Sequence, residues 1–167
     1  MELVGPFHVA TDPTHVDCFT WDRQKMQRLR ELAPLFDGAR RKELVHFLEE
    51  GHRTISLRDL DHFVTHMVPS RRIHSEYRSW LKCWGRRLFD PFRRFHRVYF
   101  YESGRYFSTT VAQLNFFLFV HSHDLLRVAQ QNAESIHRHR SDMKRQTRKK
   151  AGLVNPISVD AGSVVKF

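Results

Sequence analysis

The sequence predicts a mainly α-helical fold: a compact multi-helix domain with a small β-hairpin or sheet (α+β) and extended terminal arms. Over most of the chain, apolar residues recur at spacings of three and four, the period of a helix with one buried face. Near residues 94–108, residues alternate between two faces instead, and this pattern favours a β-hairpin. With 167 residues, 41% of them hydrophobic, the chain is long enough for one sizeable core and too apolar for a disordered protein.

Three regions follow from this pattern. Residues 1–19 lack a helical period and predict an extended N-terminal arm, with a short strand around Phe7–Val9. Residues 20–145 predict a single α-rich domain, and no repeat or long linker divides it. Residues 146–167 predict a basic C-terminal tail whose last four residues, Val164–Phe167, can form an edge strand.

Two helices are expected in the first third of the chain. The first runs from Trp21 to about Ala33, with Thr20 or Asp22 at its cap. Its buried face is predicted to consist of Met26, Leu29, Leu32 and Phe36. The second runs from about Ala39 to Glu50, and Gly51 suits the position just after its end. Its apolar positions are Leu44, Phe47 and Leu48.

Two more helices precede the hairpin. The run from Ser56 to Asp59 resembles a capping box, and it begins a helix that Pro69 ends. After a basic link at residues 70–72, a fourth helix is predicted from a seam with four- and three-residue spacing. The seam consists of Tyr77, Leu81, Trp84 and Leu88.

The hairpin is expected to turn at Glu102-Ser103-Gly104, where the glycine can adopt a positive φ. Ser108-Thr109-Thr110 then caps a helix with the apolar face Val111, Leu114, Phe117 and Leu118. After a break near residues 121–123, Asp124 is predicted to cap a last helix that extends into a basic segment.

The net charge of +10 is concentrated in two segments. Residues 71–97 hold nine Lys and Arg against Glu76 and Asp90, a balance of +7. Residues 136–150 hold seven against Asp142, a balance of +6, so the rest of the chain sums to −3. Such blocks attract polyanions, namely nucleic acid, an acidic membrane surface or the acidic face of a partner protein, although a basic run can also be a solvated face.

The predicted polyanion- or partner-binding residues are the cations of these two segments. The first set is Arg71, Arg72, Arg78, Lys82, Arg86, Arg87, Arg93, Arg94 and Arg97. The second set is Arg138, Arg140, Lys144, Arg145, Arg148, Lys149 and Lys150.

Residues 92–101 also mix arginines with aromatic residues, which on an exposed strand can stack on bases. We favour the alternative that one face of the hairpin is core and its arginines are solvated. Because the fourth helix carries bulky Trp80 and Trp84, it does not resemble a helix that reads base edges. The charge pattern supports at most nucleic-acid binding through backbone phosphates, which does not depend on base sequence and weakens as salt rises.

Most enzyme classes lack their signatures in this sequence. There is no phosphate-binding glycine loop, nucleophile elbow or zinc-protease helix, so we predict no catalytic residues, no cofactor and no small-molecule substrate. His62 and His66 share a helix face, and two further pairs lie at 121/123 and 137/139, but none has a nearby cysteine, so no metal site is predicted. Cys18 and Cys83 are expected to be reduced thiols of an intracellular protein.

No membrane span or secretory signal is expected. The longest apolar run, Phe116–Val120, is far shorter than the ~20 residues that a membrane helix needs. The first six residues lack the charged and apolar regions of a signal peptide.

Three sequence blocks stand out: ISLRDLDHFVT (residues 55–65), FDPFRR (89–94) and TTVAQLNFF (109–117). In this order, they resemble a family of small basic proteins encoded by nucleocytoplasmic large DNA viruses. The likeness extends roughly from Thr54 to Lys150, and it departs from the family at His62, where tryptophan is usual, and at residues 118–119. The resemblance implies a viral protein and brings no assigned activity or catalytic residue.

The shared blocks also single out two polar residues. Gln113 and Asn115 lie in a helix otherwise suited to burial, so their amides are expected to bind backbone or a partner. Asp90-Pro91-Phe92 is expected to mark the corner between helix and strand.

Together, these features predict a non-enzymatic virion structural protein, a minor capsid or inner-shell component that bridges other coat proteins through its basic surfaces. Its expected partners are other capsid or virion proteins, with DNA or the inner-membrane surface as further candidates. Its expected location is the virion, and the virus factory in the host cytoplasm during assembly. The alternative is a nucleic-acid-binding protein of viral late transcription or genome packaging.

Overall fold

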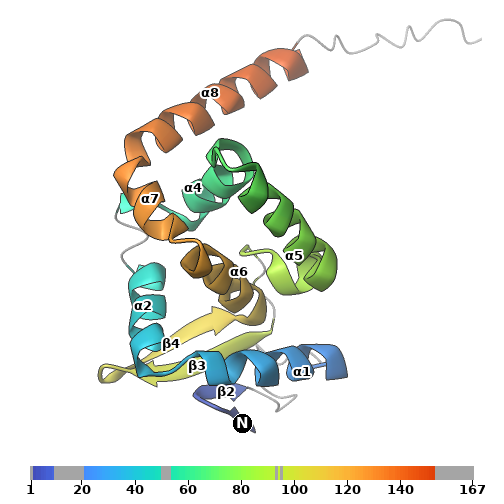
Figure 1. Cartoon of the computed structure of the whole chain (residues 1–167), viewed down its shortest axis with the longest axis vertical. Helices are drawn as coiled ribbons and strands as arrows, with labels where there is room; N and C mark the ends of the chain where they lie inside the picture. Colours follow the sequence, from blue (N-terminus) through green and yellow to red (C-terminus); the bar gives the residue numbers. More distant parts are fainter. Residues whose placement is uncertain (1, 10–20, 50–53, 93, 95, 153–167) are drawn as a thin grey trace, which may run out of the picture.

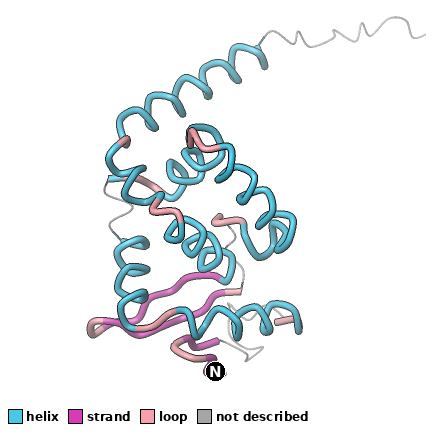
Figure 2. Tube along the Cα trace, in the orientation of Figure 1, coloured by secondary structure: helices cyan, strands magenta, loops and turns pink. Residues whose placement is uncertain are grey.

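A small antiparallel sheet lies at one end of the molecule, and a long helix, α8, projects at the other (Figure 1). This computed structural model describes residues 2–9, 21–49, 54–92, 94 and 96–152. Helices make up most of the described chain, as the tube in Figure 2 shows, so the predicted mainly α, α+β class is confirmed.

The sheet joins the start of the chain to its middle. Its strand order is β1 (Glu2–Val4), β2 (Phe7–Val9), β3 (Arg97–Glu102), β4 (Arg105–Thr110), and all neighbours are antiparallel. The predicted strand at Phe7–Val9 and the predicted hairpin are confirmed. Within the expected N-terminal arm, residues 2–9 therefore belong to the folded domain, whereas residues 10–19 lie outside the described part.

Alternation along the strands separates a core face from an outer face. Phe7 pairs with Phe100, which pairs with Phe107, and all three side chains are buried. On the opposite face of the same hairpin, Tyr101 and Tyr106 are exposed. The prediction that one face of the hairpin is core is therefore confirmed.

The first half of the helical layer follows the predicted order. It contains α1 (Arg23–Leu32), a short 3₁₀ turn (Ala33–Leu35), α2 (Gly38–Glu49), α4 (Leu57–His62) and α5 (Arg71–Phe89). Asp22 caps α1 by accepting from the Lys25 amide at 2.9 Å. The predicted capping box is present, with Ser56 and Asp59 each bonding the other's backbone amide. A π-helical turn, Phe63–Met67, continues α4.

The second half departs from prediction at two places. It contains α6 (Val111–Ser122), capped by Thr110 as expected, then α7 (Leu125–Gln131) and α8 (Ala133–Gly152). Asp124 has a left-handed backbone (φ 52°) and its side chain makes no capping hydrogen bond, so the predicted cap is wrong. The Asp124 carboxylate instead accepts from Arg127 Nε at 2.7 Å.

The end of the chain also differs from the predicted boundary at residue 145. The expected last helix is two helices that meet at Asn132, and α8 continues through residue 152. The first seven residues of the predicted tail, 146–152, are therefore helical. The predicted edge strand at Val164–Phe167 and the predicted helix-ending Gly51 lie outside the described residues.

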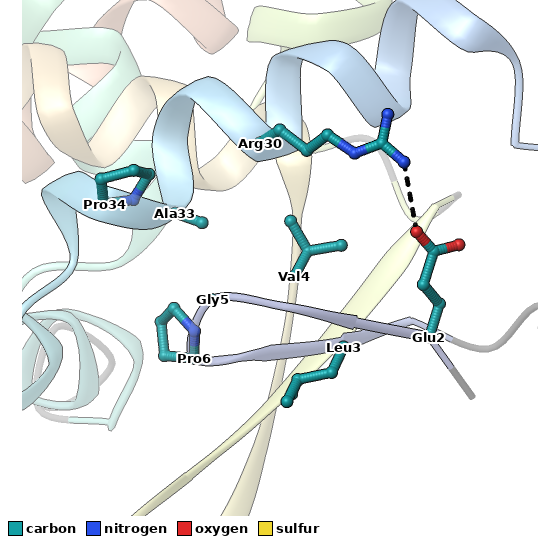
Figure 3. A pocket seen from close by; sticks show the side chains of 8 residues that line it. All are labelled: Glu2, Leu3, Val4, Gly5, Pro6, Arg30, Ala33 and Pro34. Carbon is teal, nitrogen blue, oxygen red and sulfur yellow. Dashed lines mark hydrogen bonds and ion pairs between the residues drawn. The ribbon is translucent and has the colours of Figure 1, made fainter.

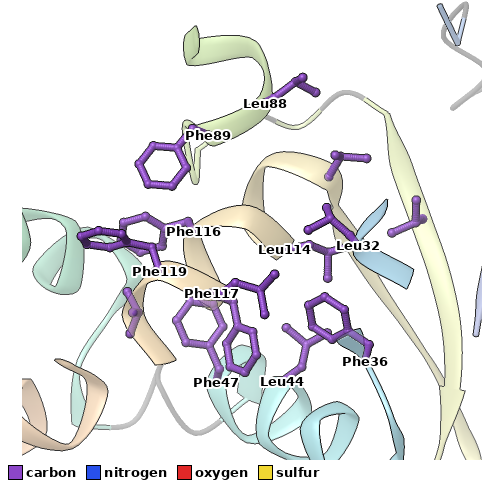
Figure 4. Packing of buried hydrophobic residues seen from close by; sticks show 14 of the residues in the cluster. Leu32, Phe36, Leu44, Phe47, Leu88, Phe89, Leu114, Phe116, Phe117 and Phe119 are labelled. Atoms are coloured by element: carbon purple, nitrogen blue, oxygen red, sulfur yellow. The ribbon is translucent and has the colours of Figure 1, made fainter. Parts of the chain in front are cut away.

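The core is organised around α6. Residues 111–120 of this helix are almost all buried, as expected for a helix that is apolar all round. Phe116, Phe117 and Phe119 point into a cluster of aromatic and aliphatic side chains from α1, α2 and α5 (Figure 4). No helix of the described chain has both the length and the apolar character needed to cross a membrane.

Gly85 breaks α5 near its C-terminal end. Its φ of 64° and ψ of 170° are not helical, and a side chain rarely adopts this conformation. The last turn of α5 is thereby redirected so that Leu88 and Phe89 are buried under α6.

We predict that Gly85→Ala lowers the free energy of unfolding by about 1–3 kcal/mol, because alanine cannot relax at this φ and ψ. The matched control is Gly38→Ala at the start of α2, where an added Cβ meets only the Arg41 guanidinium at 3.8 Å. This control is expected to be neutral or slightly stabilising. Urea denaturation measures both variants, and equal midpoints for them would contradict the prediction.

Candidate functional site

A buried amide on α6 fixes the position of α5. Asn115 is fully buried, and its Nδ2 donates to the Leu88 carbonyl at 2.6 Å. Its Oδ1 accepts from Arg28 of α1, at 3.0 Å from Nε and 2.6 Å from Nη2. One side chain thus joins α1, α5 and α6.

The Arg28 guanidinium completes this junction. It lies 3.5 Å from the centre of the Trp84 ring, and its Nη1 is 3.2 Å from Glu31. Burial lowers the pKa of Arg28, whereas the Glu31 carboxylate acts in the opposite direction. The charge is held by the amide, the ring and one carboxylate in place of bulk water.

Gln113 performs a similar task two residues earlier in α6. Its Nε2 donates to the Pro91 carbonyl at 3.1 Å, and its Oε1 accepts from Thr109 Oγ1 at 3.1 Å. Gln113 and Asn115 therefore hold the backbone at both ends of the corner after α5. The prediction that these amides bind backbone, and that Asp90-Pro91-Phe92 marks a corner, is confirmed.

The cations of α5 form an exposed face. The exposed residues are Arg71, Arg72, Arg78, Lys82, Arg86 and Arg87. Arg72 pairs with Glu76 at 2.8 Å, and the other five make no ion pair with a carboxylate of the described chain. Arg71, Arg78 and Lys82 are seven and four residues apart, so they share one side of the helix. Cys83, on the same helix, is a free exposed thiol.

The cations of α8 are even more exposed. Every residue from 141 to 149 is exposed, and this half of the helix extends beyond the rest of the domain (Figure 1). The exposed cations are Arg138, Lys144, Arg145, Arg148 and Lys149, whereas the side chain of Lys150 is not described.

Two of the predicted site residues, Arg140 and Arg97, are partly buried and bonded within the domain. Arg140 is only partly exposed and binds Asp59 of α4, so it anchors α8 instead of facing a partner. Arg97 is partly buried and its Nη1 donates to Ser108 Oγ at 3.1 Å. Arg94 is exposed, and Arg93 lies outside the described residues.

Two of the three histidine pairs, 62/66 and 137/139, meet where α8 crosses α4. His62 Nε2 is 2.8 Å from His139 Nδ1, and the His62 ring stacks on His66 at 4.6 Å. His137 Nε2 lies 3.6 Å from the Asp59 carboxylate. Sequence spacing alone does not reveal this meeting, because the two pairs are about 75 residues apart in the chain. Among the described residues, no group of three or more His, Cys, Asp or Glu is arranged to hold a metal ion.

This junction shifts the pKa values of two groups in the same direction. Burial raises the pKa of Asp59, but the Ser56 hydrogen bonds together with Arg140 and His137 outweigh it and leave the pKa lowered. Burial lowers the pKa of His62, helped by His66, His139 and Arg140 and opposed by Asp59. The folded chain therefore favours a charged Asp59 and a neutral His62.

Two cavities lie away from the basic helices α5 and α8. One, of about 440 Å³, is lined mainly by small apolar residues of the β1–β2 turn and the 3₁₀ turn, with the Arg30–Glu2 ion pair at its edge (Figure 3). The other, of about 280 Å³, holds the His121–Glu43 pair at 3.0 Å together with His46. No Ser, Thr, Cys or Tyr lines either cavity in the described chain, so neither provides a side-chain nucleophile of those types.

These observations define a small, mainly α-helical domain that exposes two basic helices, each fixed by a buried or partly buried polar junction. The chain belongs to a family of unknown function, DUF7197, whose model matches residues 19–160. No curated protein and no solved structure matches the chain.

We predict that Asn115→Ala lowers the free energy of unfolding by about 3 kcal/mol, because the Leu88 carbonyl and the Arg28 guanidinium both lose a buried partner. Urea denaturation followed by tryptophan fluorescence measures this change. The control is Gln131→Ala, which removes an exposed amide from α7 and should change the value by less than about 0.5 kcal/mol. A loss no larger than that of the control would show that the junction is dispensable.

The lowered pKa of His62 predicts acid sensitivity. Because the unfolded chain takes up this proton more readily, the stability due to neutral His62 is present above about pH 6.5 and is lost as the pH falls. His62→Phe keeps a ring but cannot titrate, so its melting temperature should fall less than that of the wild type between pH 7 and pH 5. Thermal melts at both pH values test this, and parallel decreases in the two proteins would refute it.

Proposed function

We propose that the protein is a non-enzymatic structural component of a large-DNA-virus particle, a minor capsid or inner-shell component. It binds the acidic faces of neighbouring coat proteins through the basic surfaces of α5 and α8. The observation that carries this proposal is the projecting half of α8, where residues 141–149 are all exposed and include four Lys or Arg residues against one Asp.

The shape of α8 supports a bridging role. At 20 residues and 1.5 Å per residue, the helix is about 30 Å long. Its first half is anchored by buried Ile136 and by the ion pair between Arg140 and Asp59. A polar helix that contacts nothing is only marginally stable in water, so an acidic partner surface would stabilise the projecting half.

The direction of the two helices supports contact with two partners. α8 packs against α4, α5 follows α4 in the chain after the π-helical turn, and the two helices run in different directions (Figure 1). Their exposed cations therefore face different surroundings, which suits a small protein that lies between larger ones. The polar junctions at Asn115 and Asp59 hold each helix in a fixed direction, which is what a spacer between coat proteins requires.

The alternative proposal, nucleic-acid binding in late transcription or packaging, rests on the same unpaired cations. Arginine and lysine side chains without a carboxylate partner are available to neutralise phosphates, and such binding weakens steeply as salt rises. A duplex bound in this way would be recognised through its backbone alone.

Mass spectrometry of purified particles tests the structural role. We expect the chain in mature virions, and Arg145→Glu/Arg148→Glu should reduce its incorporation about ten-fold while leaving the fold intact, because both side chains are exposed. The matched control is Arg23→Glu/Lys42→Glu, the same change of charge at exposed positions of α1 and α2. A chain present in infected cells but absent from mature particles would overturn the proposal.

Filter binding of duplex DNA at about 50 and about 200 mM salt separates the alternative from the main proposal. Affinity that falls steeply with salt, and that falls further in Arg145→Glu/Arg148→Glu than in the control variant, would favour the nucleic-acid role. Absence of duplex binding, together with normal incorporation into particles, would favour the structural role.

A further inference from the structure

The outer face of the sheet carries a cluster of rings at the opposite end of the molecule from α8 (Figure 1). Strand alternation places Leu3, His8, Tyr99, Tyr101 and Tyr106 on this face. The register makes them neighbours across the strands. Leu3 pairs with His8, His8 with Tyr99, and Tyr101 with Tyr106.

Three of the rings lie edge to face, and the two tyrosines among them are open to solvent together with Leu3. The Tyr101 and Tyr106 rings are 5.1 Å apart in an edge-to-face arrangement, and the His8 ring is 6.2 Å from Tyr106. Tyr101 is 53% exposed, Tyr106 is 68% exposed and Leu3 is 64% exposed. Contiguous exposed aromatic surface of this kind marks a binding site more often than scattered apolar residues do.

Charge distinguishes this face from an ordinary protein-binding patch. The strand carboxylates Glu2 and Glu102 lie on the opposite face of the sheet. There Glu2 pairs with Arg30 at 3.3 Å, and Glu102 pairs with Arg41 at 2.9 Å. Arg97 lies on the outer face, beside Ser108. Within the described strands, the outer face therefore combines aromatic rings with a cation and has no carboxylate.

We propose that this face binds single-stranded nucleic acid, with bases stacked on Tyr101 and Tyr106 and the backbone phosphates beside Arg97. Every base has a π face, so such a surface accepts many sequences, and the cation draws the phosphates to it. A duplex fits less well because its bases are already stacked on each other. Neighbouring strands are about 4.8 Å apart, so rings on adjacent strands can receive bases that are close together in an extended strand.

This site is independent of the function proposed above. None of its residues belongs to α5 or α8, so loss of one surface leaves the other in place. The two surfaces also predict different ligands, since the basic helices lack an exposed cluster of tyrosines and the sheet face lacks a row of cations.

Fluorescence anisotropy with a labelled oligothymidylate of about 15 nucleotides tests the proposal. Tyr101→Ala/Tyr106→Ala should raise the Kd about ten-fold or more, because two stacking positions are lost. Tyr101→Phe/Tyr106→Phe keeps both rings and should bind almost as the wild type does. Both pairs leave the core untouched, and circular dichroism and thermal melts of the variants check that they fold.

Two comparisons make the result decisive. Arg145→Glu/Arg148→Glu should leave oligothymidylate binding within about two-fold, because α8 lies at the other end of the molecule. An unlabelled duplex of equal length should compete much less well than the unlabelled single strand. No binding of the oligothymidylate, an unchanged Kd in the alanine pair, or equal competition by the duplex would each overturn the proposal, and the last two would point to a partner other than stacked bases.

Discussion

The hydrogen bonds of Asn115 are the constraint on which the arrangement of helices depends. An apolar helix such as α6 can pack in several rotations with similar burial, because dispersion and the hydrophobic effect are not directional. One buried amide that must satisfy both Leu88 and Arg28 selects a single rotation and register. Since Leu88 follows the bend at Gly85, the same bonds also fix where α5 ends and which of its sides faces outward. Together with the packing of Tyr77 and Trp80 against Phe119, these bonds set the direction in which the exposed cations of α5 face.

The second junction uses one carboxylate for two helices. Asp59 completes the capping box at the start of α4 and also binds Arg140 of α8. A cap is a local device, and an ion pair between helices is a tertiary one. By combining them, Asp59 makes the start of one helix and the direction of another depend on the same charge. The surrounding histidines add to this dependence, because a neutral His62 fits between His66 and His139 more readily than a charged one.

The features that the sequence predicts correctly depend on residues close together in the chain. The features that it misses depend mainly on contacts between residues far apart in the chain. The capping box at Ser56, the turn at Gly104 and the apolar periods of α1 and α5 are each complete within a few residues. The extension of α8 has no apolar period to reveal it, since lysine and arginine favour a helix without creating a buried face. The local sequence places Arg140 among the cations of a basic segment. Its partner, Asp59, lies 81 residues away, so no local signal reveals the ion pair. Asp124 carries a cap residue's side chain, yet its left-handed backbone directs that side chain to Arg127.

The pairing of Phe7 with Phe100 has a consequence for the order of folding. During synthesis β2 emerges early and has no strand to pair with, apart from β1, until more than ninety residues have followed. The helices between them consist mainly of local contacts and can form first, whereas closure of such a distant pairing costs chain entropy and is slow. For much of its synthesis, the nascent protein therefore carries an apolar strand, β2, whose edge toward β3 has no partner. The first and last parts of the sheet are joined only when β3 is complete, so a truncated chain that ends before residue 97 would leave the N-terminal hairpin exposed and prone to aggregate.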